Sequence, residues 1–170
     1  MGAVAFNPDG STTCIKASQE QRERIDVLEL KAVLLAIEAF DIRNRALMVH
    51  IDNSGDLFAL VRGFGKSAKC TYLVHRILKR IFEAGASVFF DYVKSEKNIA
   101  DAFTREEREA GARAWLGPGL VDAISQSQES FAEADRLFGI TPAEGKSKRD
   151  IGFALALVGE SRQGASDESD

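Results

Sequence analysis

Apolar and polar residues follow one another along the first hundred positions in a way that predicts a succession of strands and helices. The apolar run 2–6 and the segment 11–16, with its two threonines, Cys14 and Ile15, flank the turn-forming segment Asn7-Pro8-Asp9-Gly10 and therefore predict a β-hairpin. Between residues 26 and 40 the apolar residues recur with the 3.6-residue period of a helix. The apolar run 46–52 that follows predicts a further strand.

The pattern continues with more helices and one more strand. Residues 56–62 predict a short helix, the run Gly63-Phe64-Gly65 interrupts it, and 67–84 predict a longer helix that Gly85 ends. Residues 87–93 predict a strand, and Asn98 begins a helix that extends to about residue 112. The order ββαβ(α)αβα predicts an α/β fold with one mixed sheet flanked by helices.

The length of the chain indicates its domain organisation. A chain of 170 residues is long enough for one domain and a small additional structural element. We expect residues 1–112 to form the α/β domain. Residues 113–140 are expected to form a helical C-terminal appendage, with a helix over 129–138. Residues 141–170 have little to bury and end in an acidic run, so we expect a mostly disordered tail.

Composition and charge narrow the class of protein. Apolar residues make up 45% of the chain and charged residues 28%, as in an ordinary globular protein. The net charge of −4 shows no general basic excess, so nucleic-acid binding would depend on a local basic face. The candidate basic face lies on or just before the predicted helix 67–84 and could contact backbone phosphates of a nucleic acid. It could equally be an ordinary solvent-exposed helix face. Its residues are Lys66, Lys69, Arg76, Lys79 and Arg80.

The sequence gives no indication of export or of a membrane. The first apolar run is too short for a secretory leader, and the late run 151–158 is far below the roughly 20 residues that span a bilayer. Cys14 and Cys70 are far apart and fit no metal-ligand spacing, so reduced thiols are expected. We therefore expect a soluble, intracellular protein with no membrane partner.

Three carboxylates occur at the ends of predicted elements. Glu29 lies in the first helix, Asp52 ends the strand 46–52, and Asp101 opens the helix that starts at Asn98. If these ends meet, the carboxylates would form a cluster of hard oxygen ligands suited to Mg²⁺ or Mn²⁺, with Asn53 and Asn98 orienting them.

Each carboxylate also has a simpler explanation at the start of a helix. Asp26 with Glu29, and Asn98 with Asp101, have the spacing of capping boxes, and Asp52-Asn53 could cap the next helix. For each carboxylate alone, capping explains the position at least as well as metal binding does, and the metal site is favoured for the three together only with the family resemblance that follows.

Three segments of the sequence can be compared, by their order and spacing, with the signature segments of a known family. They are residues 25–33, 49–54 and 92–105. They resemble the first helix, the central strand with its Asp, and the final strand–loop–helix of ribonuclease H domains of the reverse transcriptase and retroelement type. The resemblance covers about residues 2–110. It implies a ribonuclease H-like sheet and hydrolysis of the RNA strand of RNA–DNA hybrids with Mg²⁺ or Mn²⁺ held by Glu29, Asp52 and Asp101. It also implies an upstream polymerase domain as a partner.

The sequence departs from this family at its beginning. Ribonuclease H domains start with a strand that carries another metal-binding Asp, whereas this chain begins at the second strand and has no acidic residue before Asp9. We therefore expect either a fragment of a longer protein or a degenerate relative, with weak or absent activity. The alternative function is an inactive ribonuclease H-like module that binds nucleic acid or protein. An exonuclease or integrase core is a third reading, against which the ending 98–101 argues.

Overall fold

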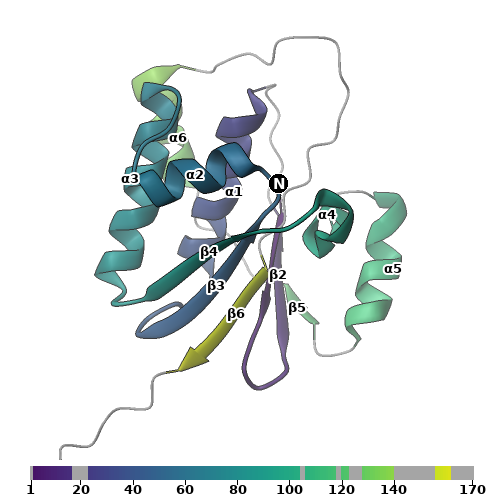
Figure 1. Cartoon of the computed structure of the whole chain (residues 1–170). Helices are drawn as coiled ribbons and strands as arrows, with labels where there is room; N and C mark the ends of the chain where they lie inside the picture. Colours follow the sequence, from purple (N-terminus) through teal and green to yellow (C-terminus); the bar gives the residue numbers. More distant parts are fainter. Residues whose placement is uncertain are drawn as a thin grey trace, which may run out of the picture.

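A computed structural model describes residues 2–16, 23–103, 106–117, 120–122, 128–139 and 156–161, shown in Figure 1. The six strands of this part of the chain form one mixed sheet in the order β4-β3-β6-β1-β2-β5. β1 and β2 form the expected antiparallel hairpin, while β3 and β4 run parallel. The strands are β1 (Gly2–Phe6), β2 (Thr12–Lys16), β3 (Arg45–Ile51), β4 (Ser87–Tyr92), β5 (Leu120–Asp122) and β6 (Ala156–Ser161).

Helices cover both faces of the sheet, so the predicted α/β class is confirmed. On one face pack α1 (Ile25–Ala39), α2 (Ser54–Arg62), α3 (Ala68–Glu83) and α6 (Gln128–Phe138). On the other face α4 (Ile99–Phe103) and α5 (Glu106–Leu116) pack against the hairpin (Figure 1). Because side chains alternate along a strand, Ala3 and Ala5 enter the first core while Val4 packs with Phe103 in the second.

The first seven elements have the types and positions that the sequence predicted, to within two residues. Local signals explain their ends. Asn53 caps α2, the left-handed Gly63 (φ 82°) ends it, and Ser67 caps α3 through a bond from the Cys70 amide.

The segment after residue 98 differs from the prediction in its element boundaries. A single helix was expected to about residue 112, but α4 ends at Phe103 and α5 runs on to Leu116. Gly111 lies inside α5, and Gly117, with φ 76°, ends it. The expected helical appendage does contain α6, but it also contains β5, which pairs with β2. A three-residue strand is too short for periodicity to reveal.

β6 is the largest departure from the sequence-based expectation. Residues 156–161 belong to the expected tail, yet they lie between β1 and β3, parallel to β1 and antiparallel to β3. The other residues of 141–170 lie outside the described part. An apolar run of three residues, Ala156-Leu157-Val158, carries no period by itself, and neighbours on both sides supply its backbone hydrogen bonds. β1 is therefore paired on both sides, with β2 and with β6.

In the described part of the chain, no helix combines the length and the apolar character that crossing a membrane requires.

Candidate carboxylate site

Three elements bring carboxyl groups together beside the end of β3. Glu29 lies in the second turn of α1, and Asp52 directly follows the last residue of β3. Asn53 then caps α2, accepting hydrogen bonds from the amides of Gly55 (2.8 Å) and Asp56 (3.4 Å). This cap directs the first turn of α2, with Asp56, toward α1.

Glu29 and Asp56 are the buried centre of the site. Their relative exposures are 5% and 4%, and their carboxyl groups lie within hydrogen-bonding reach of each other. Within the described part of the chain, Glu29 Oε2 and Asp56 Oδ2 have no hydrogen-bond donor from any other group. Asn53 is close enough to Glu29 to act against the rise of its pKa, and its expected role as an orienting residue stays a prediction. Two facing carboxyl groups of this kind need a shared proton or a cation between them.

The pKa values of Glu29 and Asp56 also indicate that the pair needs a shared proton or a cation. Burial, followed by the hydrogen bond and the charge of Asp56, raises the pKa of Glu29 to about 11; Asp52 contributes further. Burial also raises the pKa of Asp56 to about 6, although the hydrogen bond with Glu29 acts in the opposite direction. At neutral pH, and without a cation, Glu29 therefore keeps its proton beside an ionised Asp56.

Asp56 was absent from the sequence-based site, although the sequence contained a signal for it. Asp56, Ala59 and Leu60 have the i, i+3, i+4 spacing of one helix face, and all three are buried. An aspartate on an apolar helix face is rarely buried without a partner. The spacing therefore indicated that Asp56 faces a binding partner or another polar group.

Asp101 belongs to α4, which packs on the face of the sheet opposite α1. It is buried on α4, next to Ala100 and Phe103, which pack against β1. The carboxyl groups that dominate at Glu29 are Asp56 and Asp52. In the described ranges, no three His, Cys, Asp or Glu side chains are arranged as ligands of one metal ion. The structure thus brings Glu29 and Asp52 into one neighbourhood but does not assemble the predicted trio with Asp101.

The capping alternatives have different outcomes. The N-cap of α1 is Arg24 and makes no side-chain capping bond, while Asp26 pairs with Arg24 (3.0 Å). Capping therefore does not explain Glu29. Asn53 does cap a helix, in addition to contacting Glu29. The side-chain nitrogen of Asn98 is buried without a partner in the described chain, so its expected role as an orienting residue stays a prediction.

The predicted basic face is largely neutralised by carboxylates. Lys69 was placed there wrongly: it is 3% exposed and binds Glu23 and Asp135, because helix periodicity turns it toward α1 and α6. Arg76 pairs with Glu133 of α6. Lys79 and Arg80 remain on the surface but pair with Glu83 and, for Arg80, with Glu38.

Lys66 is the member of that set whose charge is directed to the carboxylate site. It is exposed, makes no ion pair within the described residues, and acts electrostatically on Asp56. A Cβ at Gly55 would lie 3.3 Å from Lys66 Nζ, so the absence of a side chain at Gly55 leaves room for the ammonium group over the start of α2.

The donor set fits a hard divalent cation. Mg²⁺ is commonly held by one or two carboxylates, with water and substrate phosphate completing its shell. Glu29 and Asp56 present two such groups with free buried oxygens, and Asp52 adds a third negative charge nearby. Comparison of the chain with family models, with curated proteins and with solved structures found no match in any of the three.

Proposed function

We propose that this chain is a ribonuclease H-like nuclease domain that hydrolyses the RNA strand of RNA–DNA hybrids with a divalent cation held by Glu29 and Asp56, beside the charge of Asp52. The observation that carries the proposal is the pair of buried, facing carboxyl groups with unsatisfied oxygens beside the end of β3. Ligands of α/β proteins bind at the carboxyl ends of parallel strands, and β3 and β4 end there. The RNA–DNA hybrid as substrate comes from the resemblance of residues 25–33, 49–54 and 92–105.

The chain's own residues would divide the work at this site. Glu29 and Asp56 would hold the cation, and Asn53 would keep the Glu29 carboxylate in its rotamer while capping α2. Lys66, over the start of α2, would bind a phosphate of the nucleic-acid backbone. When bound, Mg²⁺ or Mn²⁺ would supply charge neutralisation at the phosphate and an activated water.

Activity of this chain is expected to be weak. In the described residues no third carboxylate joins Glu29 and Asp56 as a ligand of one cation, and Asp101 belongs to α4, which packs on the opposite face of the sheet from α1. The inactive nucleic-acid- or protein-binding module therefore remains the second candidate. The unassembled trio favours it.

Cleavage of a labelled RNA–DNA hybrid by the full chain tests the proposal. We expect cutting of the RNA strand with MgCl2 or MnCl2, loss of cutting with EDTA, and at least an approximately tenfold decrease for Asp56→Asn and for Asp52→Asn. Glu83→Gln is the matched control, because this carboxylate lies at the exposed end of α3 and pairs with the surface residues Lys79 and Arg80. Asp101→Asn shows in the same assay whether the third predicted carboxylate takes part.

A second measurement does not depend on activity. A cation that binds only the folded protein stabilises it, by about 2.7 kcal/mol at a concentration 100 times its Kd. We expect this stabilisation in the parent chain and its loss in Asp56→Asn. Stabilisation without cleavage would favour the inactive module. Absence of both, or cleavage that persists in Asp52→Asn and Asp56→Asn, would overturn the proposal.

A further inference from the structure

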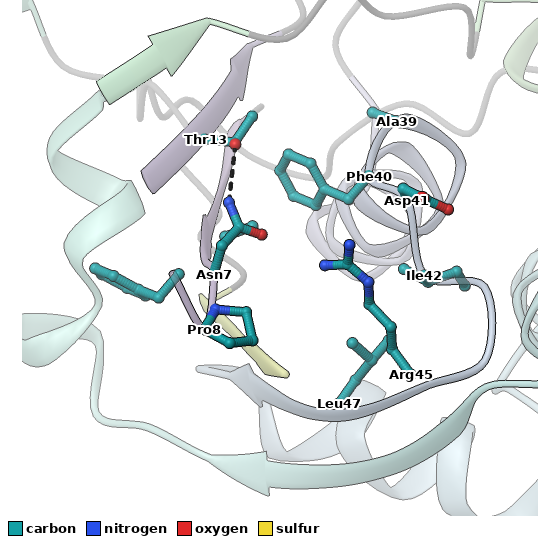
Figure 2. Close-up of a pocket in the computed structure, with 11 residues that line it drawn as sticks. Asn7, Pro8, Thr13, Ala39, Phe40, Asp41, Ile42, Arg45 and Leu47 are labelled. Atoms are coloured by element: carbon teal, nitrogen blue, oxygen red, sulfur yellow. Dashed lines mark hydrogen bonds between the residues drawn. The ribbon is translucent and has the colours of Figure 1, made fainter. Parts of the chain in front are cut away.

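A second concave site lies at the end of the sheet away from the carboxylates. It is a cavity of about 190 Å³ between the β1–β2 hairpin, the end of α1 and the start of β3 (Figure 2). Phe40, which lines it, is eleven residues beyond Glu29, about 16 Å along a helix axis. Arg45 begins β3, whereas Asp52 follows its end. The two sites are therefore separate.

The cavity contains one guanidinium group, that of Arg45. Arg45 extends into it (Figure 2), and its side chain makes no hydrogen bond or ion pair to any described residue. Its nearest acidic neighbours are engaged elsewhere. Asp41 accepts hydrogen bonds from the Arg43 side chain (2.9 and 3.4 Å), and Asp9 accepts one from the Ser11 amide (2.8 Å). A partly buried guanidinium without an acceptor favours binding of an anion.

The remaining wall is mostly apolar. The ring of Phe40 points into the cavity beside Arg45, and Leu47 and Pro8 lie on the other sides (Figure 2). Asn7 donates its side-chain amide to Ser11 Oγ (3.0 Å) and Thr13 Oγ1 (3.3 Å), so those hydrogens are used within the hairpin. Asp41 also lines the cavity, but its carboxylate is held by the Arg43 side chain. Arg45 thus supplies the charged donor and Phe40 the flat apolar surface.

We propose that this cavity binds a small organic carboxylate whose anionic group pairs with Arg45 and whose apolar part packs on Phe40 and Leu47. A cavity of about 150 Å³ can hold benzene, so the volume of about 190 Å³ suits a ligand the size of one aromatic ring with its carboxylate. A single guanidinium balances a single negative charge. The carboxylates of Asp9 and Asp41 lie close enough to interact with Arg45, and they disfavour a dianionic phosphate there.

Binding of benzoate to the full chain, followed by NMR chemical-shift changes or calorimetry, tests this site. We expect shifts confined to residues around Phe40 and Arg45, binding at least about tenfold weaker for Arg45→Gln, and much weaker binding of the neutral analogue benzyl alcohol. Arg62→Gln is the control, because Arg62 lies on α2 over Phe58, away from the cavity. Arg45→Lys keeps the charge without the fork-shaped donor and should give an intermediate affinity.

Each other outcome counts against the proposal. Unchanged benzoate affinity in Arg45→Gln, or equal affinity for benzyl alcohol, would show that the guanidinium recognises no anion. Inorganic phosphate that displaces benzoate at equal concentration would overturn the assignment to a monoanionic carboxylate. No shift around Phe40 with benzoate in large excess would remove the site altogether. None of these results depends on the carboxylate site near Glu29.

Discussion

The ionic cluster of Glu23, Lys31, Lys69 and Asp135 offers the sharpest test of the packing. Lys31 and Lys69 are 1% and 3% exposed, and both bind the carboxylates of Glu23 and Asp135. Asp135 accepts bonds from Lys31 at 2.9 and 3.1 Å and from Lys69 at 2.7 Å. Although burial raises the pKa of Asp135, the hydrogen bonds from Lys69 and Lys31 outweigh it and hold that pKa below its usual value.

Asp135→Asn would leave two buried ammonium groups with one carboxylate. Removing one partner of a buried ion pair costs about 3–5 kcal/mol, and we expect about 3 kcal/mol because Asp135 itself is 30% exposed. For a chain of this size the thermal midpoint should fall by roughly 6–12 °C. Urea unfolding followed by circular dichroism measures the free energy of unfolding.

Glu133→Gln is a matched control on the same helix, since its pair with Arg76 is closer to the surface and should contribute at most about 1 kcal/mol. Adding Lys31→Met to Asp135→Asn should restore part of the lost stability, because it removes the unpaired ammonium. A loss for Asp135→Asn no larger than that for Glu133→Gln would refute the buried cluster and, with it, this position of α6.

Three further predictions concern other parts of the molecule. Gly65→Ala should lower the free energy of unfolding by about 1–3 kcal/mol, because the added Cβ would lie 2.4 Å from the Cβ of Cys70. Gly111→Ala is the control in the same urea assay. It lies in α5 with open space around it, so the substitution should be neutral or stabilising. In EDTA, the free energy of unfolding of the parent chain should fall relative to that of Glu29→Gln as the pH rises from 5 to 8. The reason is that the raised pKa keeps Glu29 protonated in the folded state, while the same group ionises in the unfolded state, which is thereby favoured. Parallel plots of unfolding free energy against pH for the two proteins would contradict the raised pKa. Lys66→Gln should weaken binding of an RNA–DNA hybrid without changing the stability of the fold. The slope of log binding constant against log salt concentration should become smaller in magnitude by about one. Equal effects of Lys79→Gln, which removes a surface lysine paired with Glu83, would argue against a special role for Lys66.

Local patterning was sufficient for most of the secondary structure. The hairpin at Asn7–Gly10, the period of α1 and the cap at Asn53 depend on residues within a few positions of one another, so the sequence displayed them directly. Glu29, near the start of α1, and Asp52, directly after β3, were selected as candidates in the same way, because an acidic residue near the end of an apolar element is visible in the sequence itself. The function that they were taken to indicate remains a proposal.

Tertiary structure decided which side chains meet. The facing of Asp56 and Glu29, the burial of Lys69 among carboxylates, and the position of β6 inside the sheet each join segments that are far apart in the chain. Periodicity states which face of an element is apolar, but not which element covers that face. The partners of a buried charge or of a short strand are set by packing across the whole domain, and that is why only the coordinates revealed them.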